Sequence, residues 1–164
     1  MFDGFLRVAA ATPDIRVADC NFNGASAAAL VSEAYEQGVS LLVLPELCLT
    51  GYTCSDLFLQ ESLLDGAGKA LLTLTEATRG KNMVVLAGLP LTVNGVLYNV
   101  AAVLHDGDIL GFVPKSYLPT YSEFYEGRHY HSGADIETDV LFNGRTYPFG
   151  TRLLFRCRQM PAFT

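Results

Sequence analysis

The chain has 164 residues, of which half are hydrophobic and 17% are charged, and its mean hydropathy is +0.26. This length and composition exclude a disordered tail and predict a globular domain with a substantial core. The net charge of −6 and the pI near 4.9 argue against nucleic acid or an anionic membrane as the main partner, because both require a basic protein surface.

Neither the N-terminus nor the cysteines suggest an exported protein. Residues 1–7 carry an acid where a signal peptide has basic residues, and no apolar run approaches the length of a membrane span. The four cysteines have no CxxC spacing and are too few for a disulfide scaffold, so we expect reduced thiols. These features predict a cytoplasmic protein.

The first part of the chain predicts a parallel strand–helix–strand unit. Residues 5–11 and 41–44 are short apolar runs suited to strands, and residues 23–37 between them predict a helix that Gly38 ends. Near-continuous apolar strands joined by a crossover helix are typical of a parallel pair buried on both faces.

Two more helices and a third strand are expected next. Ser55 is a candidate N-cap for a helix over residues 56–64, and a second helix is predicted over 66–78, ending at Arg79-Gly80. Residues 83–89 then predict a third buried strand.

From residue 90 onward the pattern predicts antiparallel strands. Asn94-Gly95 is a strong hairpin signal. The segments expected around it are a strand at 96–104, a turn at 105–108, a strand at 109–113, an irregular aromatic loop at 116–130, a hairpin near Asn143-Gly144 and a last strand at 151–157. The fold class is therefore α/β with a mixed sheet. Whether the aromatic loop lines a pocket or packs as surface is left open by the sequence.

Two charged residues each follow an apolar strand and a proline. Glu46 follows Pro45 and Lys115 follows Pro114. Burial there would raise the pKa of Glu46 toward that of a general base, although a carboxylate that only caps a turn or pairs with a lysine is the alternative. We expect Glu46 and Lys115 to meet, because both should end buried strands that lie side by side. Such a pair suits amide hydrolysis through a cysteine, in which the carboxylate takes the thiol proton and the lysine stabilises the oxyanion.

Two segments carry a resemblance to a known family. LLVLPELCLTGYTCSDLF at 41–58 and GFVPKSYLPTYSEFYEGRHY at 111–130 resemble the glutamate and lysine motifs of the nitrilase, or carbon-nitrogen hydrolase, superfamily. The SDLF and LPTYSEFYE portions are more specific to the glutaminase domains of glutamine-dependent NAD synthetases. The resemblance implies a four-layer αββα sandwich. It also implies Glu46 as general base, Lys115 as the oxyanion-stabilising residue, Glu123 as an additional glutamate of the site, and Tyr52, Tyr121 and Phe124 as residues that shape the glutamine pocket.

One family feature is missing from the sequence. The nucleophilic cysteine of the family lies in a GxEICEDLW-like segment, which this chain does not contain. Cys48, Cys54 and Cys157 are each expected to be structural. We therefore expect residues 1–164 to form a single incomplete glutaminase domain without a nucleophile, inactive by itself, with one sheet face exposed and with the synthetase domain absent.

The resemblance also implies the function and the partners of the complete protein. It would hydrolyse L-glutamine and supply ammonia for ATP-dependent synthesis of NAD from nicotinic acid adenine dinucleotide. The expected partners are the missing C-terminal half, the synthetase domain and further copies of the protein, and ATP and Mg belong to the synthetase domain. No cofactor or metal is expected here, since His129 and His131 lack a nearby third ligand and no phosphate-binding glycine loop occurs. The alternatives are a stand-alone nitrilase-type amidase and a non-catalytic interaction module; the presence of both Glu46 and Lys115 counts against the module.

Overall fold

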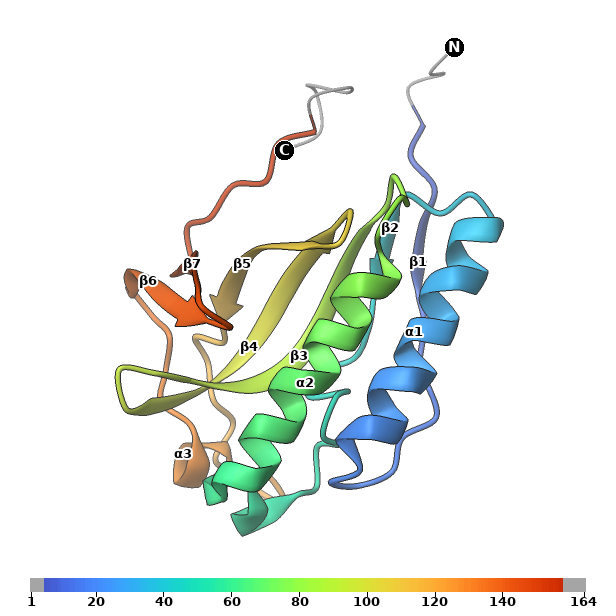
Figure 1. Cartoon of the computed structure of the whole chain (residues 1–164). Coiled ribbons are helices and arrows are strands. Elements are labelled where there is room, and N and C mark those ends of the chain that lie inside the picture. The colour runs from blue at the N-terminus through green and yellow to red at the C-terminus, as the bar shows by residue number, and fades with distance from the viewer. Residues whose placement is uncertain (1–4, 158–164) are drawn as a thin grey trace.

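The computed structural model describes residues 5–157. It consists of a seven-stranded mixed sheet in the order β1-β2-β3-β4-β5-β7-β6, with two long helices packed on one face (Figure 1). Sequence expectations for residues 1–4 and 158–164 lie outside the described residues. No helix in the described part is long and apolar enough to cross a membrane.

The predicted parallel unit is confirmed. Strand β1 (Val8–Ala10) pairs in parallel with β2 (Leu41–Val43), which pairs in parallel with β3 (Val84–Val93). Helix α1 (Cys20–Glu36) makes the crossover; it starts earlier than predicted because Asp19 accepts the Phe22 N–H and caps its first turn. Strand β1 is shorter than the predicted segment 5–11.

The prediction of a helix break near Gly66 is wrong. Helix α2 (Glu61–Ala77) runs without interruption, and a separate 3₁₀ turn, η1 (Ser55–Leu59), precedes it. Ser55, the predicted N-cap, has a positive φ of 52°. Helix η1 has no side-chain hydrogen bond at its N-terminal cap. Gly66 of α2 instead serves the contact between the two helices, since a Cβ at Gly66 would lie 3.2 Å from the Cys20 Sγ.

The predicted hairpins after β3 are confirmed. Strands β3, β4 (Val96–His105) and β5 (Asp108–Pro114) are antiparallel, and Asn94 and Gly95 both take the positive φ that a tight hairpin turn requires. Strands β6 (Glu137–Phe142) and β7 (Arg145–Gly150) form the last hairpin, with β7 parallel to β5.

The predicted strand at 151–157 is wrong, because regular pairing stops at Gly150. The Arg152 N–H, which a strand would offer to a neighbour, is taken by the carboxylate of Glu137. The predicted irregular loop at 116–130 also contains a single helical turn, α3 (Glu126–His129).

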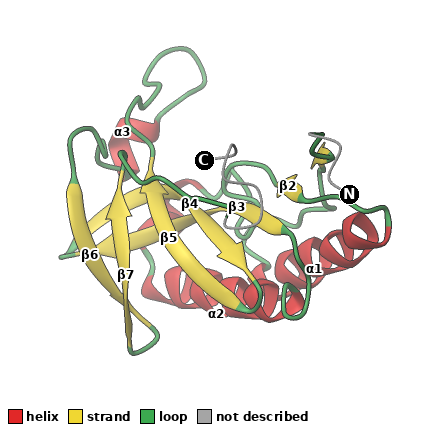
Figure 2. Cartoon of the chain, turned by 90° about the horizontal axis from the view of Figure 1, so that it is seen from above, coloured by secondary structure: helices red, strands yellow, loops and turns green. Residues whose placement is uncertain are grey.

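The two faces of the sheet differ in burial. On the helix side Leu42, Val85 and Leu104 are fully buried, whereas Val8 and Val43 on the opposite face are 60% and 40% exposed. Figure 2 shows both long helices, α1 and α2, on the lower side of the sheet. The prediction that the parallel strands are buried on both faces is therefore wrong for this chain. One helical layer and one sheet are the first part of the expected sandwich, and the expected open face is present.

Candidate active site

Glu46 is carried across the sheet by a loop that passes over Gly88 of β3. A Cβ at Gly88 would lie 2.3 Å from the Leu47 nitrogen and 2.7 Å from the Pro45 carbonyl oxygen, so only glycine fits beneath the loop. Further along, the Leu49 N–H donates to the Gly88 carbonyl oxygen at 3.3 Å. Backbone contacts with β3 thus fix the position from which the Glu46 side chain extends.

Glu46 and Lys115 meet in the folded chain, as predicted. The Lys115 Nζ lies 2.7 Å from the Glu46 Oε1, and the Asn99 side chain on β4 donates to the same oxygen. Lys115 follows β5 directly, and its N–H donates to the Asn99 carbonyl oxygen at 2.8 Å. Asn99 therefore aligns both members of the pair.

Two details of the predicted pair are wrong. Strands β2 and β5 do not lie side by side, since β3 and β4 separate them, and the pair forms only because the Glu46 loop crosses β3. Burial is also incomplete, because the side chains of Glu46 and Lys115 are 41% and 29% exposed. The carboxylate remains accessible to a group arriving from outside the described residues.

Glu126, which the sequence reasoning missed, completes the site. Its Oε1 lies 2.8 Å from the Lys115 Nζ and accepts a 2.6 Å hydrogen bond from the Tyr52 hydroxyl, and its side chain is only 4% exposed. Glu123, the residue assigned from the resemblance, is exposed and lines the neighbouring pocket. Both glutamates lie in the LPTYSEFYE segment, so the sequence pattern did not indicate which of them would reach Lys115. The helical turn at 126–129 buries Glu126 and thereby decides it.

The electrostatics keep the lysine charged and the tyrosine protonated. Burial acts to lower the pKa of Lys115, but hydrogen bonds to Glu126 and Glu46 outweigh it and raise that pKa above its ordinary value. Burial, together with the hydrogen bond to Glu126, raises the pKa of Tyr52. At neutral pH the site is a lysine ammonium held between two glutamates, with a phenol donating to one of them.

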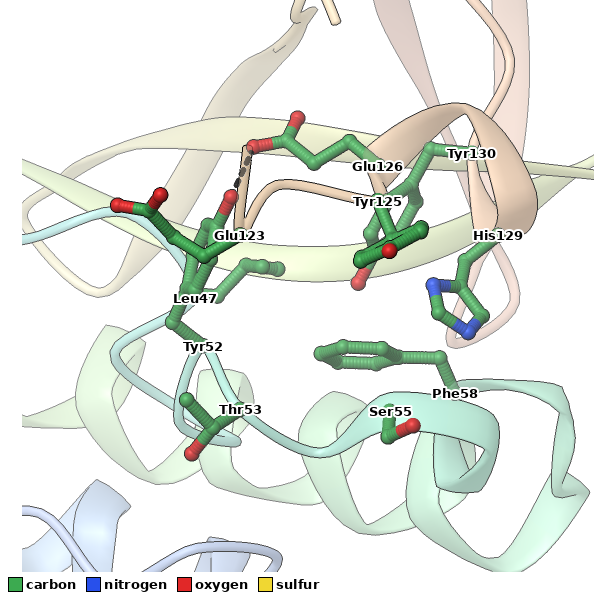
Figure 3. Close-up of a pocket in the computed structure, with 10 residues that line it drawn as sticks. All are labelled: Leu47, Tyr52, Thr53, Ser55, Phe58, Glu123, Tyr125, Glu126, His129 and Tyr130. Carbon is green, nitrogen blue, oxygen red and sulfur yellow. Dashed lines mark hydrogen bonds between the residues drawn. The ribbon is translucent and has the colours of Figure 1, made fainter. Parts of the chain in front are cut away.

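The aromatic residues assigned to the glutamine pocket pack in a row beside this cluster. Tyr52 meets Phe124 edge-on at 6.3 Å between ring centroids, and Phe124 meets Tyr121 at 5.8 Å. A pocket of about 220 Å³ lies next to them, between η1 and α3 (Figure 3). Tyr52 and Glu123 are among its lining residues, while Phe124 and Tyr121 lie outside that lining.

The cysteines near the site are buried and poorly suited to act as nucleophiles. Burial raises the pKa of the Cys48 thiol to about 11, and burial also raises the pKa of Cys54. Both thiols are therefore protonated at neutral pH. No group of three metal-binding side chains occurs within residues 5–157.

Comparison with known proteins shows which family this chain resembles. The model of the carbon-nitrogen hydrolase family matches residues 7–153. The glutamine-dependent NAD(+) synthetase of Mycobacterium tuberculosis is 42% identical over 160 residues, which cover 98% of this chain and 24% of that protein. A crystal structure of the glutamine-dependent NAD(+) synthetase from Cytophaga hutchinsonii matches with a TM-score of 0.86 at 29% identity, covering 93% of this chain and 26% of that one.

A more distant match concerns the fold alone. An amidase from Nesterenkonia sp. is 22% identical with a TM-score of 0.64, over 87% of this chain and 54% of the amidase. This chain spans about a quarter of the length of the curated synthetases that it matches. Because the family model covers nearly all of the described residues, the chain belongs to the carbon-nitrogen hydrolase family.

Proposed function

We propose that this chain is the N-terminal portion of a glutamine amidohydrolase domain, which supplies ammonia for ATP-dependent synthesis of NAD from nicotinic acid adenine dinucleotide. The observation that carries the proposal is the Lys115 ammonium bound at once to Glu46 and Glu126, at 2.7 and 2.8 Å. The similarity to glutamine-dependent NAD synthetases over 98% of the chain supports the choice of substrate.

Glu46 is the general base in this proposal. Its carboxylate is accessible, and Asn99 and Lys115 both bind Oε1, which orients the group while leaving its second oxygen to accept a proton. A carboxylate in this position takes the thiol proton of a cysteine nucleophile and later returns it to the departing ammonia.

Lys115 stabilises the oxyanion that forms when the thiolate attacks the glutamine amide. Its pKa is raised by the two carboxylates, so the positive charge is present throughout the reaction. Glu126 holds the ammonium from the buried side, and the Tyr52 hydroxyl donates to the same Glu126 oxygen. This arrangement pre-organises the ammonium and limits its reorganisation during the reaction.

The nucleophile is supplied by a part of the domain other than residues 5–157. Cys48 and Cys54 support this assignment, because both are buried and their thiols donate to the backbone carbonyl oxygens of Gly88 and Thr50 rather than to Glu46. Without a thiolate the chain has a base and an oxyanion group but no route to an acyl-enzyme, so we expect it to be inactive alone. ATP and Mg act in the synthetase domain and have no role in the steps described here.

The test uses the complete enzyme that contains this chain. Glu46→Gln keeps the shape of the side chain but cannot accept a proton, so glutamine-dependent NAD synthesis should fall about 10³-fold. Synthesis from free ammonium should stay within about twofold of wild type, since ammonia bypasses the glutaminase site.

Three results would count against the proposal. Equal loss of both activities would make Glu46 a structural residue. Amide hydrolysis without any ATP-dependent synthesis would identify a stand-alone amidase. Glutamine turnover by residues 1–164 alone would show that the nucleophile is already present.

A further inference from the structure

A charged contact outside the catalytic cluster joins the two elements that form the walls of the pocket. Arg128 of α3 donates two hydrogen bonds to the Asp56 carboxylate of η1, at 2.9 Å and 3.0 Å. The His129 Nε2 lies 3.2 Å from the same carboxylate. Asp56 and Arg128 are 72 residues apart in sequence, so this contact, here called the η1–α3 clasp, fixes the distance between two remote segments.

The clasp acts on a short helix that is anchored at its ends by backbone hydrogen bonds. The Glu126 N–H donates to the Pro119 carbonyl oxygen at 3.2 Å, and the His131 N–H beyond the helix donates to the Leu97 carbonyl oxygen at 2.9 Å. Helix α3 has only four residues, Glu126–His129, and a single turn has almost no intrinsic stability. Its first residue is Glu126, whose carboxylate reaches Lys115. The geometry of α3 therefore decides where the buried carboxylate of the catalytic cluster lies.

Aromatic packing alone leaves this geometry incompletely determined. Phe58 of η1 contacts the rings of His129 and Tyr130 at 5.8 and 5.2 Å between centroids. These contacts set the distance between η1 and α3. They still allow α3 to slide and rotate over the face of the Phe58 ring. A two-pronged carboxylate–guanidinium pair has a defined orientation and restricts both.

We propose that Asp56 is a positioning residue, which acts through Arg128 and α3 to hold Glu126 against Lys115. Its catalytic consequence rests on the proposed function, but its structural consequence does not. Asp56 is exposed, so the clasp can be removed without opening the core. The arginine beside it also holds the pKa of the Asp56 carboxyl below its usual range, so the clasp is charged at neutral pH.

The structural test follows the titration of Lys115 by NMR in the chain labelled with ¹³C-lysine. If Asp56→Asn or Arg128→Gln releases α3, Glu126 moves away and the Lys115 pKa falls by about one unit. The Arg128→Gln variant is decisive because its direct effect is opposite. Removing a positive charge would by itself raise the pKa of a lysine, so a fall reports the displacement of Glu126.

Two controls accompany the titration. Asp56→Glu retains a carboxylate and should keep most of the Lys115 shift. Asp108→Asn removes the corresponding two-pronged pair with Arg145, at 2.8 and 2.9 Å, at the far end of β5. It makes the same charge change as Asp56→Asn and should leave the Lys115 pKa within about 0.2 units.

The enzymatic test uses the complete enzyme. Asp56→Asn and Arg128→Gln should lower kcat for glutamine hydrolysis about tenfold, with less than twofold change in KM, and Asp56→Glu should restore most of it. An unchanged or raised Lys115 pKa in Arg128→Gln would overturn the positioning role. A lowered pKa in an enzyme whose wild type does not hydrolyse glutamine would leave the positioning role standing and reject the proposed function.

Discussion

Lys115 is contacted by two glutamates that reach it in different ways. Glu46 extends from a loop whose backbone is held against β3 at Gly88, and its side chain is 41% exposed. Glu126 extends from a one-turn helix inside the loop between β5 and β6, and its side chain is buried. The accessible carboxylate extends from a backbone packed closely against β3, while the buried one extends from a single helical turn and is enclosed by Lys115 and Tyr52. This division suits a base that must receive a proton from another group and a partner that must keep the lysine in place.

The largest expected effect tests the backbone side of this comparison. In Gly88→Ala the added Cβ would meet the Leu47 nitrogen at 2.3 Å, so the Glu46 loop must move. We expect a loss of about 3 kcal/mol in the free energy of unfolding, measured by urea denaturation.

A matched control separates this clash from a general effect of alanine. Gly68 lies within α2, and a Cβ there would meet the Phe142 Cε2 at an ordinary 3.5 Å. Gly68→Ala should stabilise the chain by about 0.5 kcal/mol, because alanine favours helix more than glycine does. A Gly88→Ala variant as stable as wild type would contradict the loop crossing.

The next effect compares the two carboxylates directly. Glu126→Ala leaves the partly buried Tyr52 hydroxyl and one side of Lys115 without an acceptor, and should cost about 2 kcal/mol. Glu46→Ala removes a half-exposed partner of Lys115 and also the acceptor of the buried Asn99 amide, and should cost about 1 kcal/mol. Equal losses in urea denaturation would mean that the two glutamates are not held differently.

The sequence predicted the helices, strands and turns better than the contacts between distant segments. The βαβ order and the Asn94-Gly95 turn follow from local apolar runs and turn residues, which act over a few positions. The route of Glu46 across β3 depends on Gly88, and nothing in the sequence marks that glycine as lying beneath a loop some forty residues earlier in the chain.

The remaining errors have the same origin in contacts between distant residues. The sequence predicted two helices with a break between residues 64 and 66, but α2 is continuous there and Gly66 allows it to approach Cys20 of α1. Glu126 and Glu123 share one aromatic loop, and only the folded chain shows which of them is buried against Lys115. Exposure of Val43 depends on which layers cover the sheet, and an apolar strand looks the same whether its partner layer is present or absent.

A smaller effect concerns alkaline pH. Burial raises the pKa of Cys48 to about 11, and the pKa values of Tyr52 and Lys115 are also raised. The folded chain therefore holds these protons more tightly than the unfolded chain. Their contribution to the free energy of unfolding is complete below the pKa values of the unfolded chain, and it is lost as the pH rises through the pKa values of the folded chain.

The expected result is a decline in the free energy of unfolding that begins near pH 9. Cys48→Ala should flatten the first part of this decline by about 1 kcal/mol between pH 9 and 11. Stability that rises over this interval, measured by denaturation at each pH, would contradict the sign of these shifts.

The smallest effect concerns a hydroxyl on the Glu126 side of the cluster. The Tyr130 OH is buried and has no hydrogen-bond partner among residues 5–157. Tyr130→Phe should therefore leave the free energy of unfolding unchanged or raise it by about 0.5 kcal/mol, whereas Tyr52→Phe, which loses a 2.6 Å bond to Glu126, should lower it by about 1 kcal/mol. A cost for Tyr130→Phe as large as that for Tyr52→Phe would reveal a partner for this hydroxyl in the pocket.

The central claim is that Glu46 and Lys115 work as one unit in glutamine hydrolysis. The most direct measurement is glutaminase kcat/KM in the complete enzyme for Glu46→Gln, Lys115→Ala and the double variant, with ammonia-dependent synthesis as the internal control. Groups that act in one step are strongly non-additive, so the double variant should be no slower than the slower single variant, with ammonia-dependent synthesis retained. Losses that multiply in the double variant, or a parallel loss of the ammonia-dependent activity, would contradict the claim.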